Sequence, residues 1–225
     1  MLKRIETADG SHTLFHKQLH ETYHSIHGAI QESRHVFIKH GLQHWAAATR
    51  LSEVNILEVG FGTGLNALLT LLDEPTHKIV KHYDAIEPFP LSRDYTDFLN
   101  YPVLLEKGEG QSMFDKLHGA AWGEFCILTS NFTIRKILAE IQGITLESNR
   151  YDVVYFDAFA PSKQPELWSL GVLKSVADSL KPFGIFVTYS ARGQLKRDLK
   201  SLGLQVETLK GPPGKAQMVR AIKDK

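Results

Sequence analysis

The stretch Asn55 to Asn66, NILEVGFGTGLN, decides the fold of this chain. A short apolar run breaks here into three alternate glycines, and a helical pattern follows them. This order predicts a buried strand, a tight turn and the start of a helix. Gly60, Gly62 and Gly64 remove side chains where the backbone turns sharply with positive φ, or where a ligand presses against the main chain.

Two phosphate-binding motifs fail at this loop. A dinucleotide fingerprint needs a glycine where this chain has Leu65, and a P-loop needs Lys and Ser or Thr where Leu65 and Asn66 stand. The remaining pattern, E-x-G-x-G-x-G from Glu58 to Gly64, resembles the loop of class I S-adenosylmethionine-dependent methyltransferases. An acidic loop suits the sulfonium cation of that cofactor. The competing interpretation is a glycine-rich turn that binds nothing.

Length and composition narrow the class of protein. The chain has 225 residues and 43% hydrophobic content, which is ample for one α/β domain with an extension. Cys126 is the only cysteine, which excludes an internal disulfide framework and Cys-based zinc sites. The N-terminus lacks an apolar signal segment, and no apolar stretch approaches the roughly 18 residues of a membrane span. We therefore expect a soluble cytoplasmic protein with no membrane partner.

Charge is uneven along the chain. The net charge of +1 argues against a general polyanion binder. From Arg192 to the end, however, nine Lys or Arg face three acidic residues, which leaves +6. This basic region predicts either a phosphate-contacting face or an ordinary solvated surface.

Residues 1–50 differ in composition from the rest, because eight of the eleven histidines lie between His12 and His44. We interpret this part as an N-terminal extension that contributes to the site for the substrate that accepts the methyl group. Its first half alternates like a strand hairpin, and the stretch from Tyr23 to Phe37 is typical of a binding loop, with a helix following from Gln43. On a helix, histidines at 16, 20 and 24 would share one face and hold a metal. The strand pattern favours solvent-facing histidines and no metal.

Residues 51–225 form the predicted methyltransferase domain. Strand and helix patterns alternate from Val54 onward, which indicates a parallel sheet with crossover helices. Two consecutive strands, 204–209 and 217–222, follow the last helix and must pair antiparallel or leave the sheet. The expected architecture is a Rossmann-like, seven-stranded, mostly parallel sheet with an antiparallel C-terminal hairpin.

Carboxylates follow several predicted strands at the edge where such sheets bind ligands. Glu87 comes 27 residues after the first glycine of the loop, where an acid accepts hydrogen bonds from both ribose hydroxyls. Glu140 is the predicted acid on the adenine side, with Glu147 as an alternative. The full set of predicted cofactor residues is Glu58, Gly60, Phe61, Gly62, Thr63, Gly64, Asn66, Glu87, Glu140 and Asp157.

Asp157 is the predicted catalytic residue. It ends an apolar strand and precedes Phe-Ala-Pro, where a carboxylate interrupts a buried run without an obvious solvent partner. Methyl transfer to an amine needs the amine neutral and aligned, and a carboxylate that accepts its N–H orients it and can act as a base. The alternative role is a helix N-cap or turn former.

Four segments together resemble the MnmC-type tRNA methyltransferases, in the stand-alone, MnmD-like form without the FAD-dependent oxidase half. These segments are GAIQESRHVF (28–37), ILEVGFGTGLNAL (56–68), AIEPFPL (85–91) and YFDAFAPSKQPELW (155–168). The resemblance implies methylation of 5-aminomethyl(-2-thio)uridine at the tRNA wobble position, with the anticodon region as partner. It also implies that another enzyme supplies the aminomethyl substrate.

The resemblance has one departure. The family segment glycine, lysine, arginine, acid, methionine appears here with Ala216 and Gln217 in place of the arginine and the acid. This departure weakens a phosphate-gripping role for the segment and leaves Lys215 and Arg220 as the candidates for phosphate contact. The predicted acceptor-pocket residues are Tyr23, Ser25, Gln31, Glu32 and Phe159. The rival functions are methylation of another small amine or a protein, and a non-catalytic nucleotide-binding or tRNA-binding module.

Overall fold

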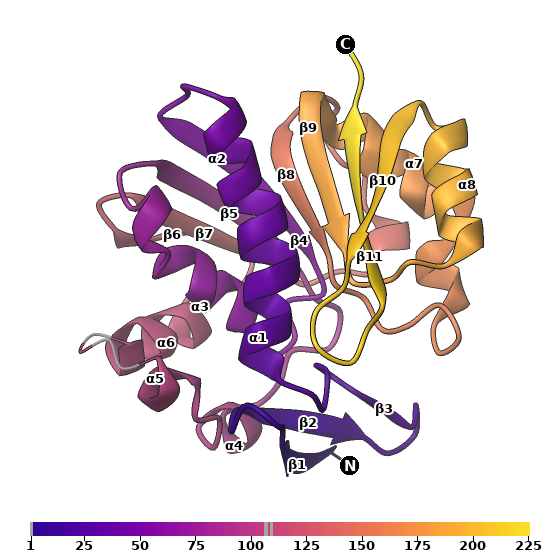
Figure 1. Ribbon diagram of the computed structural model, residues 1–225. Coiled ribbons are helices and arrows are strands. Elements are labelled where there is room, and N and C mark those ends of the chain that lie inside the picture. The colour runs from indigo at the N-terminus through magenta and orange to yellow at the C-terminus, as the bar shows by residue number, and fades with distance from the viewer. Residues whose placement is uncertain (1, 106–107, 109) are drawn as a thin grey trace.

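A large twisted sheet organises the computed structural model, which describes residues 2–105, 108 and 110–225 (Figure 1). Within those residues the sheet has eight strands in the order β10-β11-β9-β8-β4-β5-β7-β6. Its strands are β4 (Glu53–Val59), β5 (Val80–Ile86), β6 (Phe125–Thr129), β7 (Phe132–Ile137), β8 (Tyr151–Phe156), β9 (Leu180–Thr188), β10 (Leu204–Lys210) and β11 (Gln217–Lys223).

The five central strands run parallel, which confirms the predicted mostly parallel sheet. The predicted antiparallel C-terminal hairpin is confirmed as well. β4 pairs in parallel with β5 and β8, while β11 lies antiparallel between β9 and β10. The predicted number of seven strands is wrong, because β6 adds an antiparallel edge next to β7. Phe125 and Ile127 of β6 are exposed, whereas Cys126 and Leu128 pack against the core. All four residues are apolar, so the sequence lacks the alternation of apolar and polar residues that indicates a half-buried strand.

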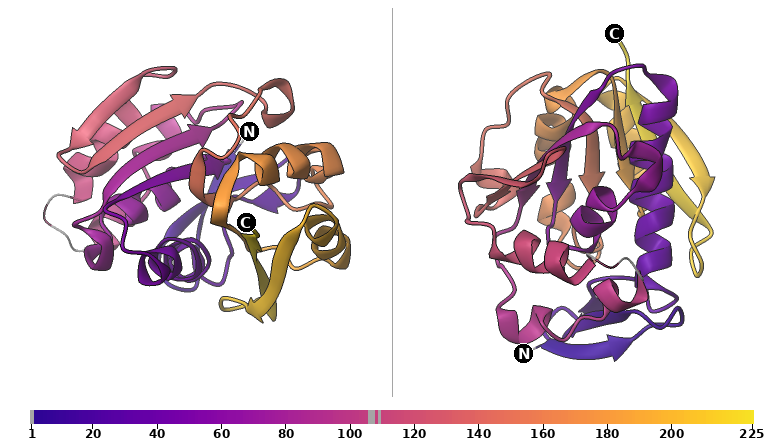
Figure 2. Two further views of the ribbon diagram at one scale, coloured as in Figure 1. Left: turned by 90° about the horizontal axis from the view of Figure 1, so that it is seen from above. Right: turned by 90° about the vertical axis from the view of Figure 1, so that its left-hand side faces the viewer.

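Helices cover both faces of the sheet (Figure 2). Alternate residues of β8 point to opposite faces: Val153 and Tyr155 belong to one apolar cluster, and Val154 and Phe156 to the other. The first cluster includes residues of α1 (Ala29–Ser33), η1 (Arg34–Gln43), α2 (His44–Ala48), α3 (Leu65–Leu71), α5 (Tyr101–Leu104) and α6 (Gly110–Gly119). The second includes residues of η3 (Ile141–Gly143), η4 (Pro165–Trp168), α7 (Leu170–Ser179) and α8 (Gly193–Ser201). Two further short helices are η2 (Glu74–Thr76) and α4 (Arg93–Thr96).

The N-terminal extension begins with a small antiparallel sheet of β1 (Leu2–Glu6), β2 (His12–His16) and β3 (Glu21–Thr22). The predicted hairpin is therefore confirmed and gains a strand. The small sheet lies across the end of the large sheet that is lowest in Figure 1. There it faces the carboxyl ends of the central strands, where a ligand site is expected in a parallel sheet.

The predicted binding loop from residue 23 to residue 37 is wrong in its second half. Helix begins at Ala29 and continues through η1 and α2. Ala29, Ile30, Val36 and Phe37 are all buried against the core. This apolar face holds the segment as a helix, so the extension shares one apolar core with the large sheet.

No helix of the described residues is long and apolar enough to cross a membrane. Among the same residues, no group of three or more His, Cys, Asp or Glu side chains is arranged to hold a metal ion.

Candidate active site

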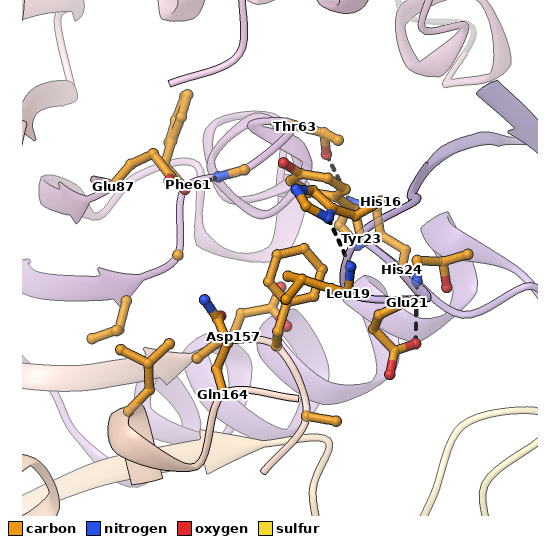
Figure 3. A pocket seen from close by; sticks show the side chains of 18 of the residues that line it. His16, Leu19, Glu21, Tyr23, His24, Phe61, Thr63, Glu87, Asp157 and Gln164 are labelled. Atoms are coloured by element: carbon orange, nitrogen blue, oxygen red, sulfur yellow. Dashed lines mark hydrogen bonds between the residues drawn. The ribbon is translucent and has the colours of Figure 1, made fainter. Parts of the chain in front are cut away.

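One cavity of about 970 Å³ lies at the carboxyl ends of the central strands, and the small sheet covers it. Such a volume is at the upper end of small-molecule sites and has room for more than one ligand. Figure 3 shows Glu87, Tyr23 and Asp157 around this space. Of the predicted site residues, those that line it are Tyr23, Ser25, Glu32, Gly60, Phe61, Gly62, Thr63, Asn66, Glu87, Glu140, Asp157, Phe159 and Lys215.

The glycine loop after β4 requires its glycines. Gly60, Gly62 and Gly64 have φ of 95°, 49° and 75°, a region that other residues adopt only at a cost. A Cβ on Gly60 would lie 2.6 Å from the backbone oxygen of Asp157, and one on Gly62 would lie 3.1 Å from the ring of Tyr23. The loop therefore presents bare backbone to the cavity.

Glu87 leaves the end of β5 and turns back to the glycine loop. Its Oε2 accepts a hydrogen bond from the Gly62 N–H at 3.0 Å, and its Oε1 accepts one from the Phe89 N–H at 2.9 Å. Burial raises the pKa of Glu87, and the two backbone hydrogen bonds oppose that rise. Each carboxylate oxygen has a second lone pair, so both oxygens can still accept from ribose hydroxyls.

Asp157 follows β8, which pairs with β4 on the side opposite to β5. Its N–H donates to the Val59 backbone oxygen at 2.9 Å, and its Oδ2 accepts from Asn66 Nδ2 at 2.8 Å. Burial raises the pKa of Asp157 to about 7, and the negative charge of Glu32 adds to this, while Asn66 and Lys215 oppose it. A carboxyl with this pKa changes its protonation state near neutral pH, which suits a proton acceptor.

Two predicted cofactor residues lie behind the cavity and do not line it. Glu58 is 0% exposed, and its Oε1 accepts from Asn66 Nδ2 at 2.9 Å. Gly64 faces the ring of His118. The prediction that Glu58 contacts the ligand directly is therefore corrected, because its carboxyl is directed into the protein. Glu140 is exposed at the edge of the cavity, just before η3.

The N-terminal extension and the C-terminal hairpin meet at the acceptor side of the cavity. The ring of Tyr23 stands edge-on to the ring of Phe159 with centroids 5.0 Å apart. Glu32 accepts from the Ser25 N–H at 2.7 Å and forms an ion pair with Lys215. Segments from both ends of the chain therefore close this side of the site.

Gln31, a predicted acceptor-pocket residue, does not line this cavity, and neither does Arg220, the predicted phosphate contact. Gln31 is exposed on a separate, smaller hollow. Arg220 is 8% exposed in β11, and its Nε donates to Glu207 at 2.5 Å. Its guanidinium is held within the hairpin, because a buried arginine needs a paired acid.

Of the lining residues that sequence reasoning missed, His24 and Tyr189 make notable polar contacts. His24 bonds through Nε2 to the Thr63 hydroxyl at 2.7 Å, and burial lowers the pKa of His24 to about 4, which keeps the ring neutral. Tyr189 donates its hydroxyl to the Ala158 backbone oxygen at 2.8 Å, and Lys215 Nζ lies 3.8 Å from the centroid of its ring. Tyr189 ends the buried run of β9, a position that could have singled it out. Nothing in the sequence separates His24 from its neighbouring histidines.

The fold and this site define a class I S-adenosylmethionine-dependent methyltransferase: a glycine loop after a central strand, with acids at the tips of the strands on either side. A sequence model of the family described as S-adenosyl-L-methionine-dependent methyltransferase matches residues 123–224. More particularly, the chain is similar to proteins named tRNA 5-methylaminomethyl-2-thiouridine biosynthesis bifunctional protein MnmC. It is 31% identical to the protein of Pseudoalteromonas atlantica, over 90% of this chain and 31% of the relative. It is also 31% identical to the protein of Burkholderia multivorans, over 88% of this chain and 32% of the relative.

The chain spans about a third of the length of these curated relatives. Among solved structures, MnmC2 from Aquifex aeolicus is 27% identical with a TM-score of 0.77, over 98% of this chain and 69% of that one. Spermidine synthase from Thermotoga maritima, 12% identical with a TM-score of 0.57 over 99% of this chain and 71% of that one, shows the fold alone. The predicted resemblance to MnmC-type methyltransferases is confirmed.

Proposed function

We propose that the protein transfers a methyl group from S-adenosylmethionine to the aminomethyl nitrogen of 5-aminomethyl(-2-thio)uridine at the tRNA wobble position. The product is 5-methylaminomethyl(-2-thio)uridine. The observation that carries the proposal is the carboxyl of Asp157, which shares one cavity with the glycine loop. The names of the curated relatives, which specify 5-methylaminomethyl-2-thiouridine in tRNA, support this acceptor.

The residues present fit the cofactor. The bare backbone at Gly60 and Gly62 allows close approach of a ligand, and Glu87 can accept hydrogen bonds from ribose hydroxyls. Glu140 lies at the edge, where an adenine would reach. Bound S-adenosylmethionine supplies an electrophilic methyl group on a sulfonium, and the acidic surroundings favour a cation there over a pyrophosphate.

The acceptor side supplies orientation and shape. Asp157 accepts an N–H of the substrate amine and directs the nitrogen lone pair away from itself. In its ionised form it also takes the proton that a primary ammonium must lose before it can act as a nucleophile. Tyr23 and Phe159 offer ring surfaces on which a base can stack. In this assignment residues 1–50 are an extension of the 51–225 methyltransferase domain that builds the acceptor pocket.

The tRNA contacts extend beyond the cavity. Exposed cations of the basic region lie on or beside α8 and at the end of β10: Arg192, Arg197, Lys200 and Lys210. Such cations attract the phosphate backbone without reading sequence. We place the anticodon stem-loop on this side. A tRNA-modifying role is consistent with a cytoplasmic location.

The direct test incubates the protein with methyl-labelled S-adenosylmethionine and bulk tRNA from cells that lack the final methylation. Digestion to nucleosides should place the label in 5-methylaminomethyl-2-thiouridine or its oxygen counterpart. Fully modified tRNA is the control and should accept no label. Cofactor binding without label in any nucleoside would refute the proposal and favour a binding module.

A salt series separates tRNA from a small amine or a protein acceptor. If the acceptor is tRNA, kcat/KM should fall steeply between 50 and 200 mM salt, by roughly tenfold or more, because each phosphate contact releases counterions. An excised aminomethyluridine nucleoside serves as the matched acceptor, and its rate should hardly respond. A salt-independent rate with tRNA would contradict this interface.

A further inference from the structure

The side chain of Asn66 is clamped between two acids. Its Nδ2 donates to Glu58 Oε1 at 2.9 Å and to Asp157 Oδ2 at 2.8 Å, so both of its N–H groups are used. Asn66 lies in the first turn of α3 and is only 2% exposed. The bond to Asp157 fixes the orientation of the amide, because the flipped amide would set its oxygen against the ionised carboxylate of Asp157.

The two acids differ in their access to the cavity. Glu58 is 0% exposed, whereas Asp157 lines the cavity and is partly exposed. Among the described residues, Glu58 Oε2 has no hydrogen-bond partner. An ionised carboxylate with an unpaired buried oxygen is far more costly than a neutral acid.

No cation of the described residues forms an ion pair with Glu58. Burial raises the pKa of Glu58 well above its usual value. The nearby Asp157 and Glu87 add to the rise, while the interactions with the Asn66 amide and the Tyr83 hydroxyl oppose it. Two carboxyl groups that share one amide do not both ionise at low cost. The deeper acid is therefore the one that keeps its proton.

We propose that Asn66 is a positioning residue that holds Asp157 ionised and aimed at the substrate amine, and that Glu58 is a neutral carboxylic acid whose task is to anchor Asn66. This inference rests on the proposed function for the identity of the amine. It gives the acidic residue before the glycine loop a role that is separate from ligand contact. It also explains why Glu58, which has no access to the cavity, lies on the strand next to the one that Asp157 follows, although Asp157 does line the cavity.

Other titratable groups act on this pair. Those that influence Asp157 are Glu32, Lys215, Glu58 and Tyr189. Those that influence Glu58 are Asp157, Glu87, Tyr83 and Tyr155. None of them donates to Asp157 within hydrogen-bond distance in the described residues, so the Asn66 amide is the side-chain donor that stabilises its ionised form.

The first test is the pH profile of single-turnover methyl transfer in Asn66→Ala. Loss of a hydrogen bond to a charged acceptor should move the acid limb upward by about one pH unit. At pH 6 the variant should therefore lose roughly tenfold in rate relative to wild type, beyond any loss seen at pH 9. Thr70→Val is the control, because Thr70 lies one turn further along α3 and its hydroxyl bonds only to the Asn66 backbone oxygen and Tyr155. Its acid limb should stay in place.

The second test needs no catalysis. Infrared spectra of Asp157→Asn at pH 7.5, in which residue 157 cannot contribute, should show the carbonyl stretch of a protonated buried carboxyl, and adding Glu58→Gln should remove it. An equal loss of rate at every pH in Asn66→Ala would overturn the positioning role, and a band that persists after Glu58→Gln is added would overturn the neutral acid. If wild type methylated no tRNA, the proposed function would fail while the infrared result stayed decisive for Glu58.

Discussion

Replacing Asp157 by Asn should strongly lower activity and stabilise the fold at the same time. The substitution keeps the shape of the side chain and an oxygen that can accept from Asn66. It removes the charge that accepts a proton from the substrate amine. We expect kcat to fall by about 100-fold to 10,000-fold, the usual range for a positioned acid or base.

The gain in stability follows from the pKa. Burial raises the pKa of Asp157 from 3.8 to about 7, so between these values the native state binds a proton that the unfolded state releases. Stability of the wild type therefore falls as pH rises through this window, and the loss is complete above pH 7. A pKa difference of about 3 corresponds to at most about 4 kcal/mol. Because Asp157 is partly exposed, we expect Asp157→Asn to recover about 2 kcal/mol at pH 8, which is about 4–8 °C in Tm for a chain of this length.

Thermal unfolding from pH 4 to pH 9 measures this effect. The Tm advantage of Asp157→Asn should be small at pH 4, grow up to about pH 7 and then level off. Asp178→Asn is the matched control, because Asp178 forms an exposed pair with Lys174, and its Tm should differ little from wild type. An Asp157→Asn protein that is equally or less stable at pH 8, or that keeps its activity, would refute the reasoning.

Two further predictions concern the walls of the cavity. Gly60→Ala should cost about 2–3 kcal/mol and weaken cofactor binding measured by calorimetry, because its Cβ would lie 2.6 Å from the Asp157 backbone oxygen at a φ of 95°. Unchanged Tm and affinity would contradict the close approach. Lys215→Met should lower the free energy of unfolding in urea by about 2–3 kcal/mol, because Glu32, 6% exposed at its side chain, loses its partner. Lys174→Met removes an exposed pair and should cost less than about 0.5 kcal/mol; equal effects of the two substitutions would show that the Glu32 pair has no special role.

Local patterns were sufficient for the central strands and for the loop between the first of them and its helix. The apolar strand predicted directly before Asp157 is β8, Tyr151–Phe156, in the structure, and all six of its residues are buried. The edge strand β6 was not predicted, because the apolar residues Phe125 and Ile127 on its exposed face hide the alternation with Cys126 and Leu128, which pack against the core. The helix that begins at Ala29 was not predicted, because its many polar residues are typical of a loop. Its buried positions nevertheless pack on the sheet.

The sequence by itself determined the class of fold and the chemical identity of the groups at the strand tips. Glycines that must adopt positive φ, and carboxylates that interrupt or end apolar runs, are local features that a linear chain records. Only the tertiary structure decided that Glu58 faces inward, that Arg220 is bound within the hairpin, and that His24 and Lys215 reach the site from opposite ends of the chain. The physical reason is that burial and pairing depend on which segments meet in space, and a carboxyl group becomes a buried acid or a proton acceptor only through those neighbours.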